Sequence, residues 1–239
     1  MTDRTDIAAL IDQCSSSDAD ARSSAARALG EAEAEHAAVA GPALTTLLCD
    51  ADDSVRNEAA EALGLLRYQP AREELERVLK CDGDWIVRAS AAEALGELAD
   101  PQALDTLIAA LADDARPVRS YAALAIGLMG ESARLPAVRA RLDVEAAVGT
   151  RAELIAAAMR LGDATVLDNL LTLTDDADPD ALPCVLETVE DLLTRKTPTI
   201  LIARAPEVSA WLAALGLRTP IISRHAAALS ARLAALVGG

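Results

Sequence analysis

The chain has 239 residues and a net charge of −16, and 52% of its residues are apolar although only 2% are aromatic and none is Phe. A core this poor in rings must be built from Ala, Leu, Val and Ile in thin layers, which closely packed helices provide and which excludes a pocket lined with aromatic side chains. No apolar run reaches the roughly 18 residues that span a bilayer, and the start lacks the features of a secretory signal, so we expect a soluble, cytoplasmic protein without membrane contact.

The charge is unevenly distributed along the chain. Residues 195–239 carry six basic side chains and one acidic side chain, a net charge of +5, so the rest of the chain carries −21. Such an acidic body repels a phosphate backbone, and we therefore expect no nucleic-acid binding. Abundant acid with scarce lysine fits either a GC-rich genome or a high-salt cytosol.

A nine-residue segment recurs along the chain. The segment Arg-Ser-Ser-Ala-Ala-Arg-Ala-Leu-Gly begins at Arg22, similar segments begin at Arg56, Arg88 and Arg119, and Arg151 follows in register. These arginines are 34, 32, 31 and 32 residues apart. A period in this range is typical of a solenoid, in which each repeat packs only on its neighbours.

Each repeat arginine lies in a predicted first helix. Counted from the arginine, small or aliphatic residues occupy positions +3, +4, +6 and +7 in most repeats, the spacing of one stripe of an α-helix. Alanine predominates in this stripe and lets a neighbouring helix approach closely. Glycine follows at position +8 in four repeats, as Gly30, Gly64, Gly96 and Gly127.

A second predicted helix follows in each repeat. Pro70, Pro101 and Pro136 lie near its start, where a missing N–H costs least. Aspartate-rich loops such as residues 50–53 and 113–114 then lead into the next first helix, whose free N–H groups a carboxylate can cap.

The segments Asp53-Ser-Val-Arg56 and Asp100-Pro-Gln-Ala-Leu104 resemble the HEAT-like repeat of the phycobilisome-lyase type. The resemblance covers about residues 18–175 as five units, and it implies an all-α, right-handed α-solenoid (superhelix) of HEAT-like helical hairpins. The fifth unit departs from the pattern because it lacks the valine before its arginine. In this family, loop aspartates and repeat arginines form a ladder between repeats, which implies a structural role for Asp53, Arg56, Arg88, Arg119 and Arg151.

We divide the chain into a repeat solenoid over residues 1–194, whose sixth repeat is degenerate, and a basic, apolar C-terminal element over residues 195–239. Two helices are predicted there, over residues 206–215 and 220–237, and an apolar stripe from Ile222 to Leu236 follows the second. This element either caps the open end of the stack or serves for docking or dimerisation, so a homodimer through these helices stays open.

The sequence contains no recognisable catalytic motif. The chain has only two histidines, His36 and His225, and it lacks both Gly-x-Ser-x-Gly and the glycine-rich phosphate-binding motifs. We therefore assign no catalytic, cofactor-binding or metal-binding residue, and we expect no cofactor.

Two further sets of candidate ligands have structural interpretations. An acidic string over residues 176–187 has the ligand spacing of a calcium loop, but Ala181 replaces the required glycine and Pro183 interrupts the loop. Cys49 and Cys81 occupy equivalent positions in neighbouring repeats, about 8–10 Å apart, whereas a disulfide needs Cα atoms within roughly 7 Å. We expect the four cysteines to be free, buried thiols.

The predicted function is that of a non-enzymatic scaffold or adaptor that binds a basic or mixed-charge protein along an acidic concave surface. We place this surface on the second helices, where the candidate residues are Glu73, Glu74, Glu76, Arg77, Asp105, Thr106, Arg139, Asp168, Asn169 and Thr172. In a chain with so few aromatic residues, Trp85 and Trp211 are either interface anchors or fillers between layers.

Two other functions stay open. A chromophore (bilin) lyase or lyase subunit is the enzymatic alternative that the resemblance suggests, and the absence of any convergent cluster of His, Cys and acid disfavours it. Nucleic-acid binding, as in HEAT-like glycosylases, is disfavoured because those proteins present basic grooves.

Overall fold

The computed structural model describes residues 4–175, 177–218 and 220–238. Within these ranges the regular structure consists of fifteen α-helices and short 3-10 turns, without strands, which confirms the all-α prediction. The chain forms two compact units, Met1–Met129 and Gly130–Gly239, which are considered separately below. The sequence-based division at residue 194, between a repeat solenoid and a C-terminal element, stays a prediction.

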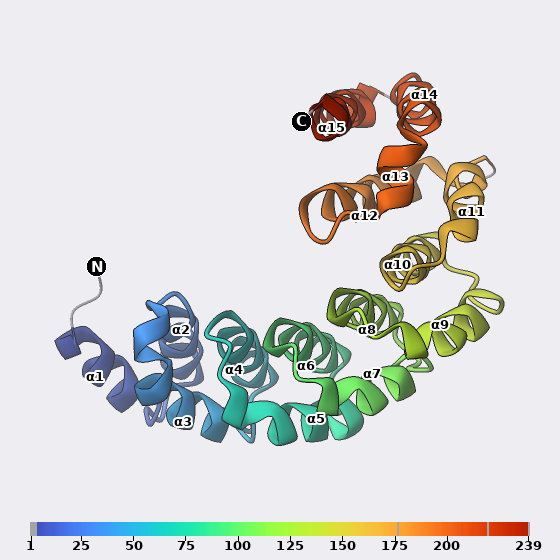
Figure 1. Ribbon diagram of the computed structural model, residues 1–239. Helices are drawn as coiled ribbons and strands as arrows, with labels where there is room; N and C mark the ends of the chain where they lie inside the picture. Colours follow the sequence, from blue (N-terminus) through green and yellow to red (C-terminus); the bar gives the residue numbers. More distant parts are fainter. Residues whose placement is uncertain (1–3, 176, 219, 239) are drawn as a thin grey trace. The chain divides into compact units, whose positions relative to one another are not determined.

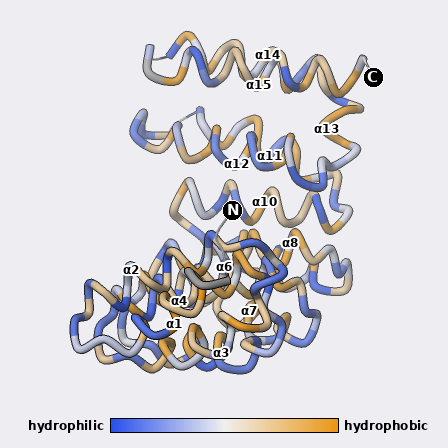
Figure 2. Tube along the Cα trace, turned by 90° about the vertical axis from the view of Figure 1, so that its left-hand side faces the viewer, coloured by the Kyte–Doolittle hydropathy of each residue, from blue (hydrophilic) through white to orange (hydrophobic). Residues whose placement is uncertain are grey.

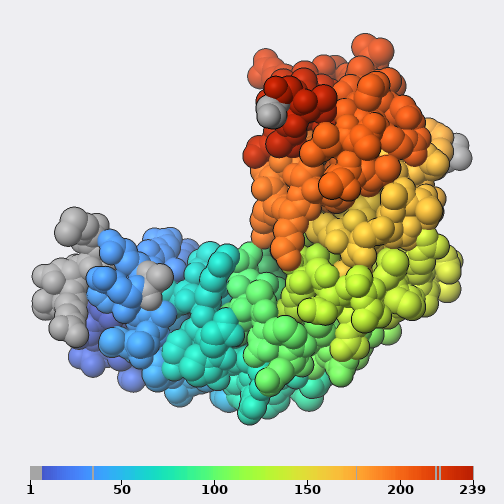
Figure 3. Space-filling model, in the orientation of Figure 1, coloured from blue at the N-terminus to red at the C-terminus, as the bar shows by residue number. Residues whose placement is uncertain are grey.

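Unit 1 is a stack of helical hairpins in two rows (Figure 1). After α1 (Arg4–Gln13), the first helices are α2 (Ala19–Gly30), α4 (Asp53–Leu65), α6 (Trp85–Leu98) and α8 (Arg116–Met129). The second helices are α3 (Ala37–Leu47), α5 (Arg72–Cys81) and α7 (Leu104–Ala110), and each follows a 3-10 turn. The colour bands of unit 1 succeed one another in chain order in Figure 3, as expected when each repeat packs on its neighbours.

Aspartate side chains begin the first helices, as the acidic loops predict. Asp52 has an extended backbone, and its side chain accepts hydrogen bonds from the N–H groups of Ser54 and Val55 at 3.0 and 3.3 Å. Asp84 caps α6 in the same way, and Asp18 caps α2. Each carboxylate thereby satisfies N–H groups that the helix itself leaves free.

The first helices approach one another closely through glycine and alanine. A Cβ atom added to Gly64 would lie 2.8 Å from the Cα atom of Ala94, and one added to Gly30 would lie 2.8 Å from the Cα atom of Ala62. Gly96 meets Ala125 in the same manner. Glycine at position +8 thus receives the alanine at position +6 of the next first helix.

This close approach determines which face of unit 1 is concave. A double row of helices curves toward the row whose members pack more closely. In unit 1, α2, α4, α6 and α8 pack on one another more extensively than α5 packs on α7, and they lie on the inner side of the curve in Figure 1. The second helices α3, α5 and α7 form the outer row. The expectation that second helices line the concave side is therefore wrong for unit 1, because the repeat pattern does not determine how closely the two rows of helices pack relative to each other.

Unit 2 consists of helices of unequal length and ends in a helical pair. It contains α9 (Leu135–Leu142), α10 (Val148–Arg160), α11 (Leu167–Thr172), α12 (Leu182–Thr194), α13 (Thr199–Ala203), α14 (Ala205–Gly216) and α15 (Pro220–Gly238). α12 packs on α10 and α15, and α14 packs on α15. The two predicted C-terminal helices correspond to α14 and α15.

Aliphatic residues of α15 cover the end of unit 2. Ile222, Ala226, Leu229 and Leu233 are buried, whereas Leu236 at the end of the expected stripe is partly exposed. In Figure 2, hydrophobic and hydrophilic segments alternate along the helices, so that each helix has one face suited to burial. None of the described helices is both long enough and apolar enough to cross a membrane.

The close approach at Gly64 predicts the effect of adding one methyl group. Helix propensity alone would favour Gly64→Ala by about 1 kcal/mol, but overpacking against backbone costs about 1–3 kcal/mol. Because the Cα atom of Ala94 cannot swing aside like a flexible side chain, we expect a net loss of unfolding free energy in urea titrations. Gly83→Ala is the matched control, since its new Cβ would meet no atom within 4 Å and should leave stability unchanged or slightly raised. Equal stability of the two variants would contradict the packing account.

Candidate functional site

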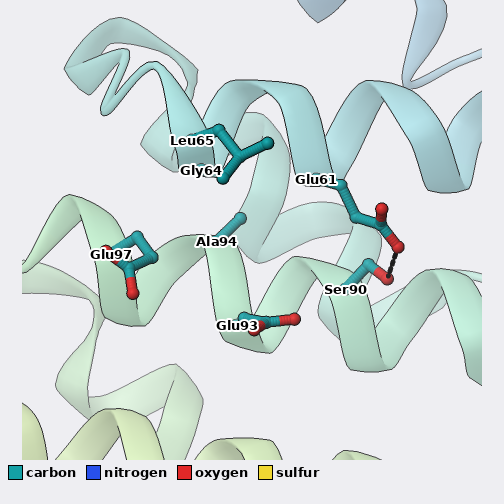
Figure 4. A pocket seen from close by; sticks show the side chains of 7 residues that line it. All are labelled: Glu61, Gly64, Leu65, Ser90, Glu93, Ala94 and Glu97. Atoms are coloured by element: carbon teal, nitrogen blue, oxygen red, sulfur yellow. Dashed lines mark hydrogen bonds between the residues drawn. The ribbon is translucent and has the colours of Figure 1, made fainter. Parts of the chain in front are cut away.

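A groove of about 260 Å³ lies between α4 and α6 on the first-helix face of unit 1 (Figure 4). We call it the α4–α6 groove, and it is lined by Glu61, Gly64, Leu65, Ser90, Glu93, Ala94 and Glu97. The small residues that bring the two helices together form its floor, and longer side chains form its walls. Position +5 supplies Glu61 and Glu93, and position +9 supplies Leu65 and Glu97, so the groove follows from the repeat itself.

The walls of the groove combine acidic and apolar groups. Glu61 accepts a hydrogen bond from the neutral Asn57 at 3.1 Å. The Ser90 hydroxyl, whose one hydrogen is shared with Asn57 at 2.7 Å, lies 3.4 Å from Glu61. Glu97 pairs with the exposed Arg67 at 3.1 Å. The Leu65 side chain is 67% exposed although the residue lies on a packed helix, so an apolar group faces solvent beside the carboxylates.

Sequence reasoning missed this groove because it assigned the concave face to the second helices. The sequence nevertheless contains two indications of the groove. The first is that Glu61 and Glu93 fall at the same repeat position, outside the buried stripe. An exposed leucine in a polar stripe, as at Leu65, was the second indication.

Two of the predicted second-helix residues are used inside the protein. Thr106 of α7 is buried and donates a hydrogen bond of 2.7 Å to Glu76 of α5. Glu76 also accepts from Arg72 and, at 3.3 Å, from Lys80. Burial disfavours the Glu76 carboxylate, but these hydrogen bonds outweigh it and lower its pKa. Glu76 and Thr106 therefore connect neighbouring second helices.

The predicted pair Glu74 and Arg77 forms a surface cluster with Cys49. Arg77 pairs with Glu74 at 2.7 Å, and this hydrogen-bonded contact lowers the pKa of Glu74. The Cys49 thiol lies 3.3 Å from both Glu74 and Arg77. Glu73 and Asp105, also on second helices of unit 1, are exposed.

The predicted residues in unit 2 lie on several elements. Arg139 donates to Asp163 and Thr165, and Asp168 pairs with Arg204 at 2.7 Å. Asn169 and Thr172 are exposed, and Thr172 donates to a main-chain carbonyl of its own helix.

The two tryptophans have different surroundings. Trp211 is half-buried, and its ring N–H donates a hydrogen bond of 3.3 Å to the buried Thr174, so it connects α14 to the segment after α11. Trp85 begins α6 and is 46% exposed, away from the groove lining. The contacts of Trp211 fit a side chain that fills space between layers. Trp85 is exposed, and its role as an interface anchor stays a prediction.

An arginine–aspartate ladder connects successive inter-repeat loops in unit 1. Arg56 binds Asp82 through two parallel hydrogen bonds of 2.8 and 2.9 Å, and its third nitrogen donates to the Asp50 carbonyl at 2.9 Å. The same geometry joins Arg22 to Asp50 and Arg88 to Asp113. Such two-pronged pairs fix orientation as well as distance.

The ladder corrects one residue of the sequence-based assignment. Asp53 forms no rung, and its carboxylate accepts a long hydrogen bond of 3.4 Å from the adjacent Ser54. The rung residue is Asp50, three positions earlier, because the carboxylate must follow the second helix to reach the preceding repeat's arginine. The resemblance pointed to the aspartate nearest the arginine in sequence.

The last two arginines of the predicted ladder are Arg119 and Arg151. Arg119 is buried and donates to the Asp113 and Asp114 carbonyls at 2.9 and 3.0 Å, which repeats part of the pattern. The residue at the ladder spacing from Arg151 is Asp176, which lies outside the described residues, as does that part of the calcium-like string. The ladder role of Arg151 stays a prediction.

The cysteines differ from the expectation of uniform burial. All four are free, but only Cys14 is buried, whereas Cys49 and Cys81 are exposed and Cys184 is intermediate. Cys49 and Cys81 follow the apolar stripes of α3 and α5, so they leave the core. Among the described residues, no group of three or more His, Cys, Asp or Glu side chains is placed to hold a metal ion.

Comparison with known proteins agrees with this geometry. Residues 7–96 and 73–158 match the HEAT repeats family. The chain is a HEAT-repeat protein. Its fold is similar to the complex of CpcE and CpcF of phycocyanin lyase from Nostoc sp. PCC7120, at 21% sequence identity over 96% of this chain and 94% of that chain, with a TM-score of 0.68.

A second solved structure shares the fold. An engineered protein covers 96% of this HEAT-repeat chain and 97% of its own length at 19% identity, with a TM-score of 0.53. No curated protein matches the chain in sequence. At these identities the structures establish a HEAT-like solenoid fold.

The ladder predicts a pH-dependent loss of stability. Burial disfavours the Asp82 carboxylate, but hydrogen bonds from Arg56 and from the Asp84 N–H outweigh it and lower the pKa of Asp82. Asp82→Asn should therefore lose about 2–3 kcal/mol of unfolding free energy at pH 7. A lowered folded-state pKa stabilises above the ordinary value of about 3.9, so the difference from wild type should vanish as the pH falls from there through the folded-state value.

Asp53→Asn is the control for this prediction, because it makes the same chemical change at an aspartate that forms no rung, three positions after the rung residue Asp50. Chemical denaturation at pH 7 and pH 3 compares the two variants. An equal loss in both would contradict the assignment of Asp82, rather than Asp53, to the ladder.

Proposed function

We propose that this HEAT-repeat protein is a non-enzymatic interaction subunit that binds a basic or mixed-charge protein in the α4–α6 groove. The observation that carries the proposal is the combination of a groove, carboxylates on both of its helices and the exposed Leu65. An arginine or lysine side chain matches this combination because its aliphatic stem packs on apolar surface while its charged head meets carboxylates.

The charges around the groove favour such a partner over an anionic one. Glu97 is paired with the exposed Arg67, while Glu61 meets only neutral donors among its hydrogen bonds. Complementary charge accelerates encounter and selects partners more than it raises affinity. The proposed complex should therefore weaken as salt rises.

The groove lining favours binding over catalysis. It contains carboxylates, small residues, Leu65 and a serine, but no His, Cys or Lys. The serine, Ser90, is buried and donates a 2.7 Å hydrogen bond to Asn57, which is not a base that could activate it.

The second candidate is one subunit of a two-protein chromophore lyase. It is favoured by the near-complete coverage of this chain by a structure from the CpcE–CpcF complex of phycocyanin lyase. Co-expression with a bilin and an acceptor protein tests this candidate, and a covalent chromophore adduct that requires this chain would support it. An acceptor that stays colourless with every co-expressed second subunit would exclude it.

Three expectations from the sequence belong to the proposal. We keep the homodimer through α14 and α15 as a prediction, which sedimentation at several protein concentrations tests. We also keep the cytoplasmic location and the absence of nucleic-acid binding as predictions.

Charge reversal tests the groove directly. The partner is first identified by affinity capture from the native cell and purified, and its dissociation constant is then measured by calorimetry. Glu61→Lys with Glu93→Lys should raise the dissociation constant by roughly 10–100-fold, since like charges would face the partner's basic side chains. Raising the salt concentration should reduce the difference between wild type and variant.

Glu73→Lys with Asp105→Lys is the matched control, because it makes the same charge change on exposed second-helix positions. Its dissociation constant should stay close to the wild-type value. A larger effect of the control than of the groove variant would move the binding face to the second helices.

A further inference from the structure

A buried polar cluster joins α10 to α12 in unit 2. Thr188 of α12 lies with its hydroxyl oxygen 2.6 Å from one carboxyl oxygen of Glu153 on α10, and 3.0 Å from the main-chain carbonyl oxygen of Cys184. The second carboxyl oxygen of Glu153 is buried and has no hydrogen-bond partner. Thr188 is itself buried, so no alternative partner is at hand from solvent.

Counting hydrogens identifies the protonation state that suits this arrangement. A threonine hydroxyl has one hydrogen and can also accept. If Glu153 is ionised, the single Thr188 hydrogen can go either to the carboxylate or to the Cys184 carbonyl, which as an interior carbonyl of α12 also accepts a helical N–H. If Glu153 is protonated, its O–H donates to Thr188, and Thr188 donates to the Cys184 carbonyl. Only a neutral carboxyl group therefore lets both Thr188 contacts form together, and it leaves no charge on the oxygen that has no partner.

The nearby arginines attract a charged Glu153 but form no hydrogen bond with it. The Arg160 side chain is only 1% exposed, and it is held by Asp191 and by the Arg195 carbonyl. Its two other nitrogens, Nε and Nη1, are buried without a partner, so no hydrogen bond from them reaches the Glu153 carboxyl group. Asp191 also accepts from the Arg195 side chain, and this pair of arginines is therefore directed toward Asp191.

The other charged groups on the elements packed against α10 lie in different contacts. On α12, Glu187 is exposed, and Glu190 pairs with His225 of α15 at 2.9 Å. Arg139 and Arg141 on α9 pair with Asp163 of the turn before α11 and with Glu145. Asp168 on α11 pairs with Arg204. The charges that act on Glu153 are thus those of Asp191, Arg160 and Arg195. Burial raises the pKa of the nearby Cys184 thiol.

We propose that Glu153 is protonated in folded unit 2 and works as a pH-sensitive latch between α10 and α12, whose ionisation loosens α12. An ionised carboxylate would place a charge among buried groups with one oxygen unpaired, which is far more costly than a neutral carboxyl group. α15 packs on α12, and α14 packs on α15, so the loosening would extend to the C-terminal helices.

The electrostatic surroundings support the latch. Burial raises the pKa of Glu153 from its ordinary 4.5 to about 7, although the Thr188 hydrogen bond and the two arginines act in the opposite direction. A raised folded-state pKa stabilises below the unfolded value, and this stabilisation is lost as the pH rises through the folded value. The latch should therefore hold at pH 6 and release above pH 7.

Hydrogen exchange on the full chain tests the latch. Between pH 6 and pH 8.5, the opening constant of the α12 amides, corrected for intrinsic exchange, should rise roughly tenfold more in wild type than in Glu153→Gln. Glutamine has the same shape and can donate to Thr188 without a charge. Glu187→Gln, on the exposed face of α12, is the matched control and should keep the wild-type pH dependence.

A titration of the wild-type chain keeps the proposal testable even if a variant fails to fold. Carbon-13 NMR of the glutamate carboxyl groups should place the midpoint of Glu153 near 7. A midpoint below pH 5, or the same pH dependence of exchange in wild type and Glu153→Gln, would overturn the proposal.

Discussion

The contact between a glycine and an alanine of successive first helices is the constraint on which the rest of unit 1 depends. At Gly64 and Ala94 the two helices are so close that a single methyl group would meet backbone. The first helices pack on one another more extensively than the second helices α5 and α7 do, and unit 1 curves toward its first helices. The same small residues leave a floor between α4 and α6, and the groove is therefore a consequence of the packing.

Polar groups are distributed in accordance with this geometry. On the loop edge, arginine and aspartate fix the distance between repeats through the ladder, and on the outer row Glu76 and Thr106 connect neighbouring second helices. These side chains are committed to the fold. The groove differs because its carboxylates lie beside the exposed Leu65. Covering an apolar side chain with a partner removes it from water, which lowers the free energy.

The sequence predicted the fold to the level of single helices, because the repeat places alanine, glycine and capping aspartate at fixed positions. It did not predict the concave face, since the curvature depends on the difference in spacing between two rows. It also named Asp53 where Asp50 forms the rung, because a pairing over 28 residues depends on loop geometry. The Glu153 cluster was missed because Glu153 and Thr188 lie 35 residues apart and carry no motif.

The central claim is that partners bind the first-helix face. It is tested most directly by a photo-crosslinking amino acid placed at Leu65 in one protein and at Glu73 in another, both exposed, with irradiation in the native cell. The account predicts that position 65 forms a crosslink to a defined protein, that excess wild-type chain competes for it, and that position 73 forms none. Crosslinks to the same protein from position 73 alone would contradict it.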